Sequence, residues 1–313
     1  MPKGQQNQRA MMAKKTGTTP STPVEPTTDR VFDKLYQAAL SIEEIDALSD
    51  GSLGFMARAM VQATLPHREV EGPIYSRSNG EYKLSISNPD GGIPFGTIPR
   101  LVLSWVTTEA VKTGKPSLVL GDSLTGFMRE LDMVPTGGRW GSITRLKEQV
   151  RRLTTSHIQL RQDTPDRFRV EHFHLFDAAD IWWTPVKPDQ STLFESTLTL
   201  NKAFFDEVTK SPVPVDMRAL KALKSSPMAL DLYLWLTYRM SYLKKPADIP
   251  WEALRRQLGT GYADTPSGRQ KFRKSVLAAL GRVAVVYPEA RVQESLQGLL
   301  IKPSPTSIKK KSL

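Results

Sequence analysis

Hydrophobic residues recur every three or four positions in segments 31–48 and 142–155 of the chain. Apolar positions with this period line one face of an α-helix, so both segments are predicted to be amphipathic helices. Residues 98–112 are mostly apolar and predict a more buried helix. A shorter helix is expected over 123–131, because a polar N-cap residue directly precedes its first turn.

Alternating apolar and polar residues predict strands. Residues 82–86 alternate in this way and are followed by an Asn-Pro-Asp-Gly-Gly turn. A short strand is predicted over 115–120. Two further strands, over 157–160 and 167–176, flank a polar turn and predict a β-hairpin. From residue 98 onwards the expected order is therefore helix, strand, helix, turn, helix and hairpin, which is the order of a winged helix.

The same order is predicted a second time. Residues 228–243 are apolar on nearly every face and predict a buried helix, and two more helices are expected over 251–258 and 269–283. A second hairpin is predicted from 285–287 and 297–301. Trp105 stands ten residues before one Lys-Pro pair and Trp235 ten residues before another. A match in order and landmarks together indicates an internal repeat.

These patterns predict an α+β protein made of two tandem winged-helix domains with disordered termini. Both termini are polar and poor in large apolar side chains, so they cannot bury enough surface to offset the entropy of ordering. The predicted divisions are a disordered basic tail at 1–29, an N-terminal domain at 30–188, a C-terminal domain at 189–302 and a basic tail at 303–313.

Composition narrows the possible functions. The chain of 313 residues carries a net charge of +11, which favours a polyanionic partner such as nucleic acid. It has no cysteine, which excludes disulfides, thiolate zinc sites and iron–sulfur clusters. No apolar run approaches the about 20 residues that span a bilayer, and the first residues do not form a signal peptide. We expect a cytoplasmic protein that binds DNA and not a membrane.

The basic charge gathers on the third helix of the first predicted unit. Between Arg139 and Thr155 five basic residues oppose one acidic residue, and the apolar residues fall on the opposite helix face. The third helix of a helix-turn-helix enters the major groove, where Arg can bond guanine. Arg145 and Arg152 are our expected base contacts, and the full set of predicted DNA-binding residues here is Arg139, Ser142, Thr144, Arg145, Lys147, Glu148, Arg151 and Arg152.

The second unit repeats this arrangement. Six basic residues oppose one acidic residue between Arg255 and Lys274. Winding 269–283 as a helix directs Gln270, Lys271 and Lys274 outward, with Arg273 at the edge. The predicted DNA-binding residues of this unit are Arg269, Gln270, Lys271, Arg273 and Lys274.

Three motifs within residues 94–153 resemble plasmid-encoded RepA-type replication initiators: GTIPRL at 96–101, LGDSL with FMREL within 120–131, and TGGRWGSITRL at 136–146. The resemblance implies a protein with two winged helices that binds repeated sites, called iterons, at its plasmid origin. It also implies recruitment of the host DnaA protein and replicative helicase, a monomer–dimer equilibrium, and repression of the protein's own gene.

Two alternatives remain open. His172 and His174 match the His-hydrophobic-His pattern of rolling-circle nickases, which hold a metal between two histidines and attack DNA with a tyrosine, here Tyr233, Tyr238 or Tyr242. A transcriptional repressor or partition protein fits the same charge pattern. A phosphate-binding P-loop is absent from the sequence. We expect a non-enzymatic protein without cofactor or metal.

Overall fold

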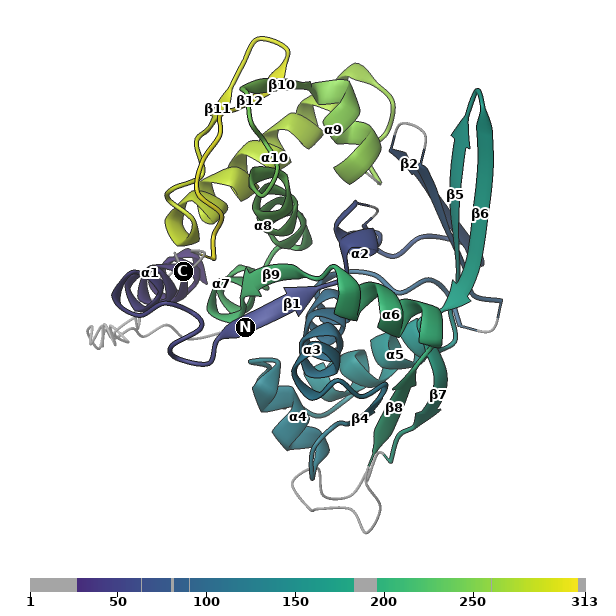
Figure 1. Cartoon of the computed structure of the whole chain (residues 1–313). Coiled ribbons are helices and arrows are strands. Elements are labelled where there is room, and N and C mark those ends of the chain that lie inside the picture. Colours follow the sequence, from purple (N-terminus) through teal and green to yellow (C-terminus); the bar gives the residue numbers. More distant parts are fainter. Residues whose placement is uncertain are drawn as a thin grey trace, which may run out of the picture.

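The computed structural model has mixed α+β structure and contains two units with the same order of elements (Figure 1). Helix α3 (Thr97–Thr113) begins the first unit. Strand β4 (Ser117–Val119), helix α4 (Leu124–Glu130) and helix α5 (Ser142–Thr154) follow, as the sequence predicts. Gly114 ends α3 in the left-handed conformation at φ 65°, and the Ser123 hydroxyl caps α4 by accepting a hydrogen bond from the Gly126 N–H. The structure describes residues 27–62, 64–79, 82–89, 91–182, 196–259 and 261–308.

The second unit has the same order of elements. Helix α8 (Pro227–Met240) is followed by strand β10 (Ala247–Pro250), helix α9 (Trp251–Leu258), helix α10 (Pro266–Val286), and strands β11 (Val292–Glu294) and β12 (Gly298–Ile301). Its three strands lie in the order β10-β12-β11. In the first unit, β4 pairs with β8 (Thr197–Leu200), which pairs with β7 (Phe176–Asp180). The strand between the first two helices therefore lies beside the last strand in both units, which supports the predicted repeat.

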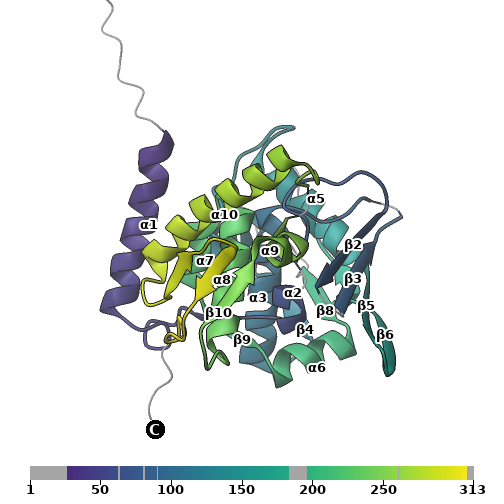
Figure 2. The same cartoon turned by 90° about the horizontal axis from the view of Figure 1, so that it is seen from above.

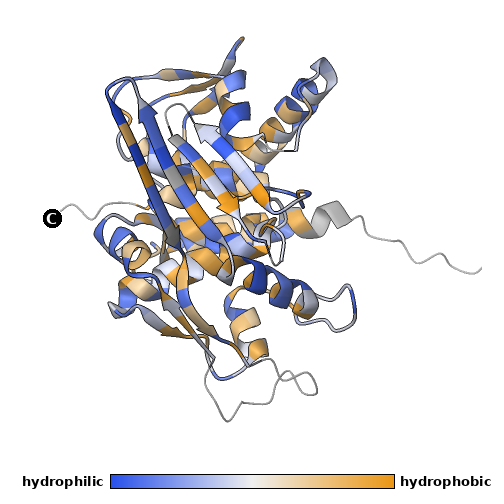
Figure 3. Ribbon diagram, turned by 90° about the vertical axis from the view of Figure 1, so that its right-hand side faces the viewer, coloured by the Kyte–Doolittle hydropathy of each residue, from blue (hydrophilic) through white to orange (hydrophobic). Residues whose placement is uncertain are grey.

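The hairpin predicted as the first wing is present but belongs to a different sheet. Strands β5 (His157–Thr164) and β6 (Arg167–His174) extend a four-stranded sheet in the order β2-β3-β5-β6, with β2 at Ile74–Asn79 and β3 at Tyr82–Ser87 (Figure 3). Ile86 of β3 lies directly opposite Ile158 of β5, and both side chains are buried. The prediction that 157–176 forms the hairpin of the first unit is therefore wrong, because β5 pairs with β3 of another sheet. Strands β7 and β8 occupy the place in the first unit that we expected for this hairpin.

The second predicted hairpin begins later than expected. Helix α10 continues through residues 285 and 286, and the first hairpin strand starts at Val292. Val283 and Val286 are both buried, so the apolar spacing of the helix persists to its last residue. Of the three residues 285–287 that we assigned to a strand, the first two are therefore the end of the helix and Tyr287 is its C-cap.

Both units share one continuous hydrophobic core. The N-terminal helix α1 (Thr27–Glu44) packs on α7 (Met217–Leu223) and α10, and strand β1 (Leu53–Met56) pairs with β9 (Val213–Asp216). The short helix α2 (Arg58–Gln62) packs on α8, and α6 (Lys202–Lys210) packs on α3. The predicted division at 188/189 lies outside the described residues and stays a prediction. Strand β8, beyond it in sequence, completes the sheet of the first unit.

The two predicted tails differ from expectation where the structure describes them. Residues 27–29 belong to α1, so the prediction of disorder is wrong for them, and residues 1–26 lie outside the described part. Residues 303–308 are bound to the core: the Tyr233 hydroxyl donates to Ser307 at 3.1 Å, and the Tyr287 hydroxyl donates to the Pro305 carbonyl at 2.5 Å. Two buried phenols need hydrogen-bond partners, and this polar segment supplies them. Residues 309–313 lie outside the described part.

No helix in the described ranges is both long enough and apolar enough to cross a bilayer.

Candidate nucleic-acid interface

Helix α5 buries the face that its sequence pattern predicts. Leu146, Val150 and Leu153 are buried, while Thr144 and Arg145 on the opposite side are exposed. Among the described residues, the Arg145 side chain makes no hydrogen bond or ion pair. A free guanidinium on the exposed side of a third helix is available to bond guanine or phosphate.

The turn before α5 is held by a reciprocal pair of hydrogen bonds. The Thr136 N–H donates to the Ser142 hydroxyl and the Ser142 N–H donates to the Thr136 hydroxyl, both at 2.8 Å. The Ser142 hydroxyl in turn donates to the Val134 carbonyl at 2.6 Å, and Thr144 donates to the Gly138 carbonyl at 2.9 Å. Buried Ser142, one of our predicted DNA contacts, therefore organises the turn and faces the protein interior.

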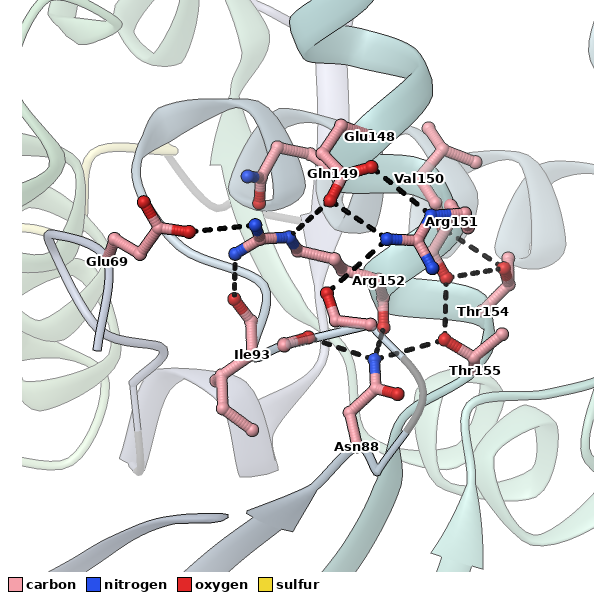
Figure 4. A network of polar contacts seen from close by, with 12 residues as sticks. Glu69, Asn88, Ile93, Glu148, Gln149, Val150, Arg151, Arg152, Thr154 and Thr155 are labelled. Atoms are coloured by element: carbon pink, nitrogen blue, oxygen red, sulfur yellow. Dashed lines mark hydrogen bonds and ion pairs between the residues drawn. The ribbon is translucent and has the colours of Figure 1, made fainter. Parts of the chain in front are cut away.

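Arg152, which we expected to contact bases, is bound within the protein instead (Figure 4). Its guanidinium donates to Glu148 at 2.8 Å, to Glu69 at 2.8 Å and to the Ile93 carbonyl at 3.2 Å. The side chain is only 14% exposed. All of its charge is directed toward partners in the protein, so we assign Arg152 a structural role.

The neighbouring residues Glu148 and Arg151 belong to the same network (Figure 4). Arg151 donates to Glu148 at 2.9 Å, and this bond, together with the one from Arg152, lowers the pKa of the Glu148 carboxyl despite its partial burial. The Arg151 guanidinium lies so close to Gly91 that a Cβ at that glycine would meet it at 2.6 Å. The C-terminal half of α5 is thus tied to the turn after β3, while its N-terminal half stays open.

The open half of α5 forms one wall of a hollow of about 670 Å³. Arg139, Thr144 and Arg145 line it on the α5 side, and Lys34 of α1 and Lys224 after α7 also line it. Trp140 lines it too, with its side chain 80% exposed. Trp140 is not among the residues predicted to contact DNA, although a bulky aromatic within a glycine-rich turn before a basic helix is itself a signal.

Helix α10 exposes the residues predicted to contact DNA in the second unit. Gln270, Lys271 and Lys274 are exposed and make no hydrogen bond or ion pair among the described residues. Arg269 pairs with Asp264 at 2.9 Å, and Arg273 pairs with Glu294 of β11 at 2.6 Å. The two arginines are engaged by the loop and the hairpin that flank the helix, which leaves the other three side chains available for a ligand.

The relative position of α5 and α10 follows from contacts between the units. Arg100 of α3 and Asp231 of α8 form a buried pair joined by two hydrogen bonds of 2.7 Å. Arg77 of β2 donates to the Arg256 carbonyl at 2.8 Å, in the last turn of α9, where a cation is favourable. Seen from above, α5 and the beginning of α10 lie at the same edge of the molecule (Figure 2), while Figure 1 shows α10 in the upper half and α5 in the lower half.

The histidines of the nickase hypothesis lie on the exposed side of β6. The His174 ring contacts the His157 ring at 4.3 Å, and His172 approaches the Gln159 amide at 3.4 Å. Within the described ranges, no group of three or more His, Cys, Asp or Glu side chains is placed to hold a metal. Tyr233 is fully buried, and its hydroxyl also accepts the Asp216 N–H at 2.9 Å, so it is enclosed in the core in this structure.

Two repeated units, each with a basic third helix, are typical of DNA-binding proteins. Comparison with known proteins identifies the family. The family model described as "Plasmid encoded RepA protein" matches residues 93–252, slightly more than half of the chain. The chain therefore belongs to the family of plasmid-encoded RepA proteins, which are replication initiators. No sequence among the curated proteins matches it.

Two solved structures of domains 2 and 3 of RctB are similar in fold. The selenomethionine form has a TM-score of 0.50 at 14% identity, over 78% of this chain and 95% of that chain. The other has a TM-score of 0.48 at 14% identity, over 78% of this chain and 96% of that chain. At such low identity the likeness to the first of them concerns the fold alone.

Proposed function

We propose that the protein initiates plasmid replication by binding iteron repeats at its origin, with α5 and α10 in successive major grooves of one duplex. The observation that carries this proposal is that α5 and the beginning of α10, each with exposed basic residues, lie at one edge of two units that share a hydrophobic core (Figure 2). Each unit is, in this proposal, a winged helix whose hairpin is β7–β8 or β11–β12. Because β8 ends at Leu200, the first unit then extends past the division predicted at residues 188 and 189.

Within this interface the side chains divide by role. Arg145 of α5 and the exposed residues Gln270 and Lys274 of α10 contact base edges. Arg139, Lys147 and Lys271 contact phosphates, which fix the register of the protein on DNA without specifying sequence. Arg151 adds a phosphate contact only through the part of its guanidinium that faces solvent.

A titration of a labelled origin duplex and a scrambled duplex tests the proposal. Wild-type protein should prefer the origin duplex, and both Arg145→Ala and Lys274→Ala should weaken that binding. If neither substitution changes affinity or preference, the two helices are not the interface. Lys202→Ala is a matched control, because Lys202 lies on α6 with an exposed side chain.

Initiation, as opposed to repression or partition, requires a second experiment. We propose that the bound protein recruits host DnaA and the replicative helicase, exists as monomer and dimer, and represses its own gene. A DNA circle carrying the gene and its upstream repeats should replicate in a suitable host. Binding without replication, even when the host factors are present, would favour the repressor or partition alternative.

A further inference from the structure

Trp140 is a large apolar side chain that this protein leaves in solvent. It is 80% exposed, immediately before the first turn of α5. The Arg139 guanidinium lies over the indole at 5.1 Å from the ring centroid, and this cation–π contact steadies the ring without covering it. An exposed indole of this size gains free energy when a partner removes it from water.

The turn that carries Trp140 is rigid. Besides the bonds between Thr136 and Ser142, Gly138 takes a left-handed φ of 85°. A Cβ on Gly141 would meet the Thr136 carbonyl oxygen at 2.2 Å, so only glycine allows this close turn. The backbone that carries Trp140 is therefore held in one arrangement, which reduces the entropy lost when a ligand binds there.

The surroundings of Trp140 indicate the kind of partner. Trp140 lines the same hollow as Thr144 and Arg145, two exposed polar residues of the N-terminal half of α5. Val134, 73% exposed, adds a second apolar group to this wall. The hollow therefore offers a ligand an apolar surface as well as the Arg145 guanidinium.

Major-groove chemistry contains one apolar group that such a surface can recognise. Each base edge offers hydrogen-bond donors or acceptors, and only thymine adds a C5-methyl group. We propose that Trp140 covers a thymine methyl next to the base pair contacted by Arg145, and so makes the site of the first unit specific for thymine at that step. This inference rests on the proposed placement of α5 in the major groove.

Uracil substitution tests the inference, because uracil differs from thymine only by lacking the methyl group. The probe is the origin duplex protected by wild-type protein, with each thymine in turn replaced by uracil. Replacing one particular thymine by uracil should weaken the binding of wild-type protein about fourfold, because it removes one methyl group from an apolar contact. Trp140→Ala should bind the thymine duplex more weakly and be indifferent to uracil there, and Trp140→Phe should keep part of the preference.

Other outcomes separate this inference from the proposed function. If Trp140→Ala weakens thymine and uracil duplexes alike and wild-type protein ignores the methyl group, Trp140 contacts the DNA backbone and the inference is wrong. If Trp140→Ala binds every duplex as wild type does, its partner is not DNA and the inference is again wrong. Arg145→Ala measured in parallel reports on the placement of α5 itself. Tyr36→Ala serves as the control, since Tyr36 is 60% exposed and lies outside the hollow.

Discussion

Arg100 on α3 and Asp231 on α8 form a bidentate ion pair in which both N–O distances are 2.7 Å. These two helices hold equivalent places in the two units, so the pair joins the repeats through corresponding helices. His67 approaches the same carboxylate at 2.7 Å. Burial alone would raise the pKa of the Asp231 carboxyl, but the charge of Arg100 and the hydrogen bonds from Arg100 and His67 hold it below its usual value. We expect the frame that positions α5 and α10 to depend on this pair.

Asp231→Ala is expected to lower the free energy of unfolding by about 3–5 kcal/mol, because it leaves the Arg100 guanidinium charged and buried without its partner. Urea denaturation measures the change. Arg100→Met, which leaves Asp231 with its contact to His67, should also lower the urea midpoint and serves as the second variant if Asp231→Ala does not fold. Asp206→Ala, at an exposed pair with Lys202, should leave the urea midpoint unchanged. A midpoint for Asp231→Ala equal to that of wild type would show that the pair does not hold the units together.

Stability should fall in acid in two steps. Burial lowers the pKa of His67 below 6.5, more than its hydrogen bond to Asp231 raises it, with Arg100 and Arg77 also lowering it. The unfolded chain then binds a proton more readily than the folded one, so stability falls as the pH drops below about 6.5. The depressed pKa of Asp231 adds a second loss below its ordinary value of 3.8.

Urea denaturation of His67→Gln at pH values from 8 to 3 checks this assignment. The amide can still donate to Asp231 but does not titrate, so the first step should disappear while the second remains. His172→Gln, at an exposed histidine, should keep both steps. A first step that persists in His67→Gln would assign it to another group.

Substitution of Arg145 should affect DNA binding, whereas substitution of Arg152 should affect the stability of the fold. Arg145→Ala should cost about 1–3 kcal/mol of binding free energy and relax specificity at one base pair, with an unchanged melting temperature. Arg152→Ala should instead lower the free energy of unfolding by about 1–2 kcal/mol, because it removes charged hydrogen bonds to Glu148 and Glu69. Thermal melting and duplex titration of both variants give the two readouts. Equal effects of the two substitutions on binding alone would contradict the structural role of Arg152.

Lys271 should act through phosphate. Lys271→Ala is expected to weaken binding to origin and scrambled duplexes by the same factor, and to reduce the slope of log affinity against log salt by about one. Titrations at several salt concentrations measure that slope. A slope equal to that of wild type would place Lys271 away from the DNA backbone.

The segment 303–308 should contribute to stability. Truncation after residue 302 removes the acceptors of the Tyr233 and Tyr287 hydroxyls, and each buried O–H donor left without an acceptor costs about 1–3 kcal/mol. Truncation after residue 308 is the matched control and should leave stability unchanged. Urea denaturation of the two truncated chains makes the comparison, and equal stability would mean that solvent replaces these bonds at no cost.

Local patterns predicted the helices of both units because their apolar faces and caps are encoded within each segment. The predicted helix over 251–258 coincides with α9, and the inner face of α5 is correct. Long-range pairings had no such signal. Nothing in segment 157–176 indicates that Ile86 is its neighbour across the sheet, and Glu69, 83 residues before Arg152, turns a predicted DNA contact into a structural one. Arg100 lies in a mostly apolar helix, where the sequence alone gives no hint of its partner 131 residues later.

A methylation-interference footprint on the origin duplex tests the central claim most directly. Two third helices on one duplex should give two blocks of major-groove interference, with centres about one helical turn, roughly 10 base pairs, apart. Arg145→Ala should remove contacts from one block and Lys274→Ala from the other. A single block, or the loss of the same contacts in both variants, would contradict the account that α5 and α10 bind one duplex together.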